Sequence, residues 1–343
     1  MRDITLKNFI FYDIYKKNIY IKYKMNIMAQ RILVTGGCGF IGSNFINYIK
    51  SLDPNIFVVT IDKLDYCSNA EGIEYDKIVV GNIGDFQLVS SILRDYNIDT
   101  VINFAAQTHI DNSFINPLEF TSDNIVGSHV LIEAVRLYGK IKKFIHISTD
   151  EVYGDVLIDH IGCTENDILN PTNPYSASKA GAEHIMKSYC YSYKMPIVIV
   201  RCNNVYGKRQ YKEKLIPRFI NLLLNNKKCT IHGDGVTRRN FIHINDICNA
   251  VVKVLMNGKI HEVYNVGCKN EYSVMDIAKI LINNLKPNSD INEWIEFVDD
   301  RNYNDFRYSI NSSKLQEIGW EEEVNFDDGI RETIEHYKKY FEK

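Results

Sequence analysis

Two residues four positions apart, Tyr175 and Lys179, form a Tyr-x-x-x-Lys pattern that could carry proton-transfer chemistry. On an α-helix this spacing places the phenol and the ammonium on one face. An ammonium close to the phenol stabilises the phenolate and lowers the tyrosine pKa, so that the phenol can act as a base near neutrality. The same spacing recurs elsewhere in the chain, but here Asn173 and Pro174 provide a helix start directly ahead of the tyrosine.

Three further polar residues, Thr149, Asp150 and Glu151, directly follow a β-branched run upstream of Tyr175. Two neighbouring carboxyl groups favour different protonation states, as an acid and base pair requires. Adjacent residues on an extended strand face opposite ways, so a shared role for these carboxyls requires the chain to curve locally. The competing interpretation is a polar strand end that caps the next turn.

A glycine-rich segment, Thr35–Gly42, contains the Gly-x-Gly-x-x-Gly spacing. Glycines let the backbone turn tightly and approach a pyrophosphate, and the following helix start supplies free N–H donors. Asp62 lies 20 residues beyond Gly42, where a carboxylate accepts hydrogen bonds from the adenosine ribose 2′-hydroxyl and repels a 2′-phosphate. This combination predicts NAD rather than NADP; the alternative is that the glycines serve helix–strand packing only. The expected cofactor contacts in this region are Gly36, Gly39, Phe40, Ile41, Gly42 and Asp62.

Short β-branched runs alternate with amphipathic stretches through the first 200 residues and must position these groups. Nearly continuous apolar strands separated by helices imply a parallel sheet covered on both faces. We therefore predict an α/β fold, a doubly wound parallel Rossmann sheet with a smaller α/β lobe, and a site at the carboxyl ends of the strands. The expected strands are Arg31–Val34, Phe57–Ile61, Lys77–Val80, Thr100–Phe104, Phe144–Ser148 and Ile197–Arg201.

The alternation weakens after Asn203, which indicates where the smaller lobe begins. The expected division is 29–202 for the dinucleotide-binding domain, with 240–270 returning to it, and 203–239 and 271–343 for the substrate-binding lobe. Acidic residues and lysines interrupt the apolar residues of the segment 1–28, which fits neither a signal peptide nor a transit peptide. We expect this segment to be a disordered extension, with Met25 or Met28 as a possible internal start.

Composition excludes several classes of partner. A net charge of −3 and a pI near 6.3 provide no broad basic surface, so nucleic acid and membrane surfaces are not expected to bind. No run of about 18 apolar residues is present to span a membrane. The eight cysteines form no Cys-x-x-Cys pair, which argues against a zinc site or a disulfide framework. We therefore expect free thiols, no bound metal and a cytoplasmic location.

At these motifs the chain resembles the nucleotide-sugar 4,6-dehydratases of the extended short-chain dehydrogenase/reductase superfamily, a group that contains dTDP-glucose and UDP-glucose 4,6-dehydratases. The resemblance extends from about Arg31 to Trp320. Epimerases and decarboxylases of the superfamily share the glycine loop and the Tyr-x-x-x-Lys pattern. The Thr-Asp-Glu segment is the feature that distinguishes the dehydratases.

The resemblance implies a role for each catalytic residue. Tyr175 accepts the proton of the sugar C4 hydroxyl while hydride passes to NAD⁺, and Thr149 hydrogen-bonds that oxygen. Glu151 then removes the C5 proton, and protonated Asp150 donates to the departing C6 hydroxyl. Hydride returns from NADH to C6, which yields a 4-keto-6-deoxy sugar, water and regenerated NAD. Lys179 completes the expected catalytic set.

Further contacts follow from the resemblance alone. Arg238 is expected to bind the diphosphate as a guanidinium fork, and Asn124 to support the central sheet near the site. Helices after Asn124 and around Tyr175 are expected to form a homodimer. Asn82 stands where the family usually has aspartate, so its contact with adenine is expected to be weaker. The additional cofactor contacts are Asn82, Ile83, Ala105, Ala106, Tyr175 and Lys179. The expected substrate contacts are Asn204, Lys214, Leu215, Pro217, Arg238, Arg301 and Asn304.

The identity of the nucleotide rests on a short segment. Bacterial dTDP-glucose enzymes usually have Gly-His where this chain has Tyr303-Asn304, and the form here resembles the UDP-glucose 4,6-dehydratase domains of rhamnose synthesis. We therefore predict conversion of UDP-glucose to UDP-4-keto-6-deoxyglucose in rhamnose-type deoxysugar synthesis, with dTDP-glucose as the alternative substrate. Two rival functions remain. A UDP-sugar epimerase or decarboxylase would lack the carboxyl pair, and an inactive NAD-binding scaffold would not need all five catalytic residues.

Overall fold

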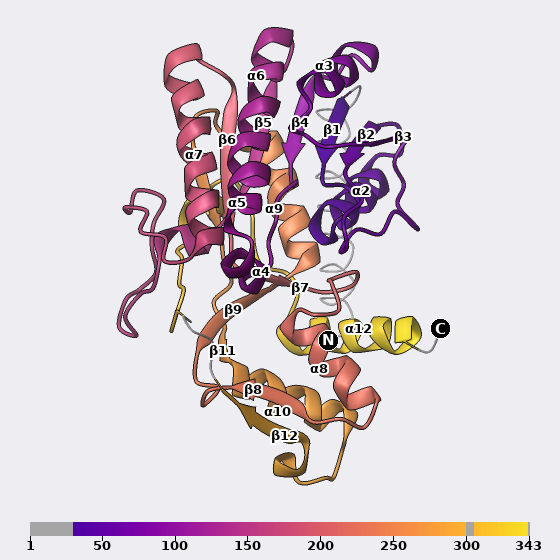
Figure 1. Ribbon diagram of the computed structural model, residues 1–343, viewed down its shortest axis with the longest axis vertical. Helices are drawn as coiled ribbons and strands as arrows, with labels where there is room; N and C mark the ends of the chain where they lie inside the picture. Colours follow the sequence, from indigo (N-terminus) through magenta and orange to yellow (C-terminus); the bar gives the residue numbers. More distant parts are fainter. Residues whose placement is uncertain (1–29, 300–304, 342–343) are drawn as a thin grey trace, which may run out of the picture.

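A seven-stranded parallel sheet forms the centre of the protein in the computed structural model, which describes residues 30–299 and 305–341 (Figure 1). The strand order is β10-β6-β5-β4-β1-β2-β3, and every neighbouring pair is parallel. This confirms the predicted doubly wound α/β fold. All six expected strands are present, and β10 is a seventh, contributed by the segment expected to return. The strands are β1 (Arg31–Thr35), β2 (Phe57–Asp62), β3 (Lys77–Val80), β4 (Thr100–Asn103), β5 (Lys143–Thr149), β6 (Ile197–Cys202) and β10 (Val263–Val266).

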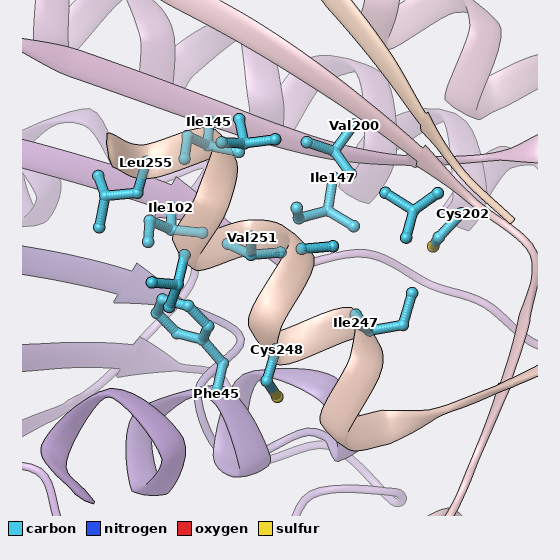
Figure 2. Close-up of a cluster of buried hydrophobic side chains, with 14 of the residues drawn as sticks. Phe45, Ile102, Ile145, Ile147, Val200, Cys202, Ile247, Cys248, Val251 and Leu255 are labelled. Carbon is cyan, nitrogen blue, oxygen red and sulfur yellow. The ribbon is translucent and has the colours of Figure 1, made fainter. Parts of the chain in front are cut away.

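Helices cover both faces of this sheet. Side chains alternate between the two faces along a strand, and accordingly Ile32 and Val34 of β1 belong to one buried cluster while Leu33 belongs to the other. The first cluster lies under α2 (Phe40–Leu52) and α9 (Ile244–Asn257), whose inward side chains Figure 2 shows against the sheet. The second lies under α3 (Phe86–Asp95), α6 (Ser128–Tyr138) and α7 (Pro174–Tyr193).

A smaller lobe extends beyond the carboxyl ends of the strands, at the bottom of Figure 1. It has its own apolar core, in which α8, α10 and α12 pack with two small sheets. One sheet has the order β11-β9-β7, and the other pairs β12 with β8. The elements are β7 (Asn204–Tyr206), α8 (Leu215–Leu224), β8 (Cys229–His232), β9 (Arg238–His243), β11 (Glu271–Ser273), α10 (Val274–Leu285), β12 (Ile295–Val298) and α12 (Phe326–Phe341).

The division into domains drawn from the sequence stays a prediction, and one part of it needs correction. Leu315 of α11 (Ser313–Glu317) and Trp320 lie in the core of the large domain, although 271–343 was assigned to the smaller lobe. The indole of Trp320 donates to the backbone oxygen of Asp246 on α9 at 3.1 Å. Packing against α9 and β10 therefore returns this segment to the large domain. The predicted extension 1–28 lies outside the described residues.

Short elements at the carboxyl edge of the sheet carry the polar groups. A 3₁₀ turn, Asp150–Tyr153, follows β5, and a π-helical segment, Thr121–Gly127, precedes α6. The predicted start of α7 is confirmed, because Asn173 and Ser176, on either side of Tyr175 in the sequence, form a reciprocal capping box. Within the described residues, none of the helices is long and apolar enough to cross a membrane.

Candidate active site

The 3₁₀ turn supplies the local curvature that the Thr-Asp-Glu segment requires. Thr149 ends β5 and caps the turn, since its hydroxyl oxygen accepts a hydrogen bond from the Glu151 N–H at 3.3 Å. The same hydroxyl donates to Asp150 at 3.2 Å. Asp150 and Glu151 are 3% and 5% exposed, so the turn directs both carboxyls into the protein instead of to opposite sides.

Burial raises the pKa values of both carboxyls above those of ordinary carboxyl groups. Burial raises the pKa of Asp150 to about 6, although amide donation from Asn203 at 2.6 Å opposes the shift. Burial and the charge of Asp150 together raise the pKa of Glu151 to about 7. Asn173 donates to Glu151 at 3.4 Å. The pair therefore exchanges protons close to neutrality, as an acid and base pair must.

Tyr175 and Lys179 lie on the first two turns of α7 beside this carboxyl pair, and both are buried. The Thr149 hydroxyl hydrogen-bonds the Tyr175 phenol, and the charges of Glu151 and Asp150 act on it. Burial raises the pKa of Tyr175 well above its ordinary value, and the carboxylates add to that shift.

The expected lowering of the tyrosine pKa by lysine does not hold in this structure. The Lys179 ammonium donates to the Ile147 backbone oxygen at 2.6 Å, and burial lowers its own pKa to about 8. Burial and the neighbouring carboxylates set the direction of the Tyr175 pKa shift.

The glycine loop has the close backbone approaches that its sequence predicts. Gly36 has a φ of +67°, and a Cβ there would lie 2.8 Å from the backbone of Ala105. A Cβ on Gly42 would lie 2.3 Å from the Gly36 carbonyl oxygen. Gly39 caps α2 without a side chain, and the first turn of α2 contains no acidic residue. Phe40 and Ile41 therefore begin a helix whose N–H groups and positive dipole end suit an anion.

A pocket beside this loop is lined by residues expected to hold the dinucleotide. Its empty space, open solvent at the mouth included, is about 630 Å³. Of the predicted cofactor contacts, seven line it: Gly36, Gly39, Asp62, Asn82, Ile83, Ala105 and Ala106. Phe40, Ile41 and Gly42 lie at the adjoining helix start, whereas Tyr175 and Lys179 lie towards the end of β5 and outside the pocket wall.

The charges of the pocket favour NAD over NADP. Asp62 ends β2 with its carboxylate accepting from the Cys38 N–H at 2.9 Å and from the Ser68 hydroxyl at 3.0 Å. Among the lysines and arginines that the structure describes, Lys63 is the one that lines the pocket. Its ammonium is held by Asp65 at 2.9 Å and Asp123 at 2.8 Å. A 2′-phosphate would therefore meet carboxylates and a neutralised lysine.

Asn124 connects the cofactor side of the site to the catalytic helix. Its side-chain amide exchanges hydrogen bonds with the Gln107 backbone at 2.7 and 3.0 Å and donates to the Ser178 hydroxyl at 2.8 Å. Gln107 belongs to the segment after β4, and Ser178 lies on α7 beside Lys179. These contacts place Asn124 in the supporting role that the resemblance implied.

Four of the predicted substrate contacts, Asn204, Lys214, Leu215 and Pro217, lie where the smaller lobe meets the sheet edge. Lys214 donates to the Thr108 backbone oxygen at 2.9 Å, and its charge acts on Glu151. Leu215 and Pro217 form the first turn of α8, and Asn204 begins β7. Arg301 and Asn304 lie outside the described residues.

Arg238, which was expected to face the substrate, is placed differently from its neighbour. Its side chain is 42% exposed and lies 3.8 Å from Glu271. Adjacent residues of β9 face opposite ways, and the positive charge that lowers the pKa of both Asp150 and Glu151 comes from Arg239. Arg239 also lies over the Tyr308 ring at 4.5 Å.

The individual site residues expected from the sequence do not include Asn203, Arg239 or Tyr308. Asn203 directly follows β6, so its place at the carboxyl end of a central strand could have identified it. Arg239 adjoins Arg238, and only the register of β9 distinguishes the two. Tyr308 acts electrostatically with Glu151, and its long separation in sequence from that residue provides no local signal.

Comparisons with known proteins agree with this geometry. A family model described as GDP-mannose 4,6 dehydratase matches residues 33–333. A dTDP-D-glucose 4,6-dehydratase of Dictyostelium discoideum is 44% identical over 92% of this chain and 83% of its own length. The chain belongs to the nucleotide-sugar 4,6-dehydratases. This confirms the predicted membership of the extended short-chain dehydrogenase/reductase superfamily.

Other relatives differ from one another in the nucleotide sugar that their names give. The Homo sapiens dTDP-D-glucose 4,6-dehydratase is 44% identical over 91% of both chains. A trifunctional Arabidopsis thaliana protein with UDP-glucose 4,6-dehydratase activity in its name is also 44% identical, over 90% of this chain and 47% of its own. The structure of a dTDP-glucose 4,6-dehydratase from Streptomyces venezuelae, solved with NAD and TYD bound, has a TM-score of 0.85 and 34% identity, covering 90% of this chain and 97% of that one. The NAD in that structure agrees with the cofactor predicted here.

Proposed function

We propose that this dehydratase converts UDP-glucose to UDP-4-keto-6-deoxyglucose and water with a tightly held NAD, as an early step of rhamnose-type deoxysugar synthesis. The observation that carries the proposal is the convergence of Thr149, Asp150, Glu151 and Tyr175 in one buried site. An epimerase needs a tyrosine and a cofactor but has no use for two buried carboxyls that titrate near neutrality. An inactive scaffold would have no reason to keep such costly groups buried.

Each residue acts at a defined sugar atom in this proposal. NAD⁺, which the glycine loop and Asp62 would hold, would supply the hydride acceptor for C4 and the hydride donor for C6. Tyr175 takes the proton of the C4 hydroxyl, which Thr149 orients. The resulting 4-ketone acidifies the C5 hydrogen, so Glu151 can remove it as a proton, and Asp150 donates a proton to the C6 oxygen as water leaves.

The acidities in the site suit the two proton transfers. With pKa values near 6 and 7, the carboxyl pair holds about one proton near pH 6.5, and that proton lies on Glu151 more often than on Asp150. Asp150 takes the acid role because of the resemblance. Lys179 ties α7, the helix that carries Tyr175, to β5, because its ammonium donates to the Ile147 backbone oxygen. We assign the diphosphate contact to Arg239 instead of Arg238, because the positive charge of Arg239 acts on Asp150 and Glu151.

The choice of UDP-glucose rests on the Tyr303-Asn304 segment, and the Arabidopsis relatives support it. The Dictyostelium and human relatives, at the same identity, favour dTDP-glucose as the second candidate. Incubation with each sugar nucleotide, followed by mass spectrometry, distinguishes the functions. A dehydratase produces loss of one water without net NADH, an epimerase leaves the mass unchanged, and a scaffold does not turn over. A higher kcat/KM for dTDP-glucose would overturn the UDP-glucose assignment.

We further propose that the protein is a cytoplasmic homodimer that contacts its copy through the helices after Asn124 and around Tyr175. Large apolar side chains are exposed on this side, among them Leu118, Val126 and Tyr191. Free cysteines are consistent with a reducing compartment. Light scattering of the purified chain tests the dimer, and a monomer at micromolar concentration would contradict it.

A further inference from the structure

Arg209, in the connection between β7 and α8, has a backbone conformation that its residue type seldom adopts. Its φ is +70°, in the left-handed region that favours glycine and asparagine. A residue with a large side chain keeps such a conformation only when its surroundings enforce it. The contacts of its guanidinium identify what enforces it.

That guanidinium bonds two segments that are far from Arg209 in the sequence, and the Arg209 backbone N–H bonds a third. Its Nε donates to the Ser43 hydroxyl at 2.9 Å. Its two terminal nitrogens donate to the backbone oxygens of Glu71 at 2.8 Å and Asn69 at 2.6 Å. The Arg209 N–H donates to His336 of α12 at 3.2 Å. One residue of the smaller lobe therefore ties α2 and the loop 63–72 to that lobe.

One segment held by Arg209 lines the cofactor pocket, and the other begins directly after the pocket residue Gly39. The loop 63–72 contributes Lys63, Asp65, Cys67 and Ser68 to the pocket wall. Ser43 lies in the first turn of α2, whose N-terminus is the expected binding site of the pyrophosphate. The Asn69 N–H also donates to the Cys38 oxygen of the glycine loop at 2.8 Å. The guanidinium thus holds the loop 63–72, which forms the outer wall of the pocket, against the start of α2.

We propose that Arg209 is a positioning residue that keeps this wall closed, so that the cofactor stays bound between the two hydride transfers. The proposal rests on the proposed function, in which hydride leaves C4 and returns to C6 through one cofactor molecule. If reduced cofactor escaped between these steps, the sugar would remain oxidised at C4 and the protein would be left without a hydride to return. Retention is therefore part of the chemistry and not only of stability.

The substitution Arg209→Asn separates these roles, because asparagine tolerates the left-handed backbone but cannot span the three acceptors. The variant should still unfold cooperatively in saturating NAD, with a midpoint lowered by the lost hydrogen bonds and by weaker cofactor binding. Dissociation of NADH, followed by fluorescence after mixing with excess NAD, should become about tenfold faster or more, since three hydrogen bonds from a charged group are lost. Free NADH should accumulate during turnover, and less NAD should remain after desalting. Arg331→Gln on the exposed side of α12 is the matched control, and its NADH dissociation should equal that of the wild type.

A second variant, Ser43→Ala, removes one acceptor and should speed NADH dissociation by a smaller factor. Combined with Arg209→Asn it should add little, because the two residues share one hydrogen bond. Wild-type NADH dissociation in Arg209→Asn would overturn the role of Arg209. Failure of the wild-type protein to dehydrate either sugar nucleotide would instead overturn the proposed function, and the cofactor measurements do not depend on that outcome.

Discussion

Replacing Glu151 by glutamine should stabilise the protein while abolishing elimination. Burial and the charge of Asp150 raise the pKa of this carboxyl from 4.5 to about 7. The folded protein therefore binds the proton more tightly than the unfolded chain, and stability falls as pH rises from about 4.5 to 7. A shift of this size corresponds to about 3 kcal/mol at pH 8 and to about 1 kcal/mol or less near pH 5. Glutamine has nearly the same shape and no charge, so it removes this penalty.

The measurement is urea unfolding of the wild type and Glu151→Gln at pH 5, 6.5 and 8, with saturating NAD in every sample. The variant should be more stable by up to about 3 kcal/mol at pH 8, and the gap should close towards pH 5. Glu317→Gln, on the exposed surface of α11, is the control and should stay within about 0.5 kcal/mol of the wild type at each pH. A variant no more stable than the wild type at pH 8, or a gap that does not depend on pH, would refute the reasoning. Wild-type turnover by Glu151→Gln would refute its role as the base.

Three further predictions concern charges around the site. The fully buried Arg201 guanidinium donates to the Glu183 carboxylate at 2.6 Å. Glu183→Ala removes this partner and should lower the free energy of unfolding in urea by about 3–5 kcal/mol. The paired change Glu183→Leu with Arg201→Met should recover most of this, and no recovery would contradict a charge effect. Arg239→Met should raise KM for the sugar nucleotide and move the acid limb of the kcat–pH profile to higher pH, because Arg239 lowers both carboxyl pKa values; an unmoved limb indicates packing only. Asp62→Ser should weaken NAD binding by about tenfold or more and narrow the preference over NADP, as titration of both cofactors would reveal.

Local patterns were sufficient to predict the main sheet and the residues nearest the chemistry. Strands buried on both faces require nearly continuous apolar runs, so β1 to β6 could be predicted from the sequence. The α7 start at Asn173-Pro174 and the glycine turn at Gly36 depend on residues only a few positions apart. The residues that follow parallel strands lie together at the carboxyl edge of the sheet. The sequence alone therefore predicted that Asp62, Thr149 and the glycine loop lie at one edge.

The sequence by itself determined which chemical groups are present and at which strand ends they stand, because short-range periodicity and backbone preferences fix helices, strands and turns. Only the tertiary structure decided how those groups behave. The Tyr175 pKa depends on burial and on carboxylates, the choice between Arg238 and Arg239 on the register of β9, and the position of Trp320 on packing against α9. Arg209 reaches a cofactor wall more than a hundred residues away in sequence. Burial, register and contacts of this kind arise from the whole fold, so no local pattern encodes them.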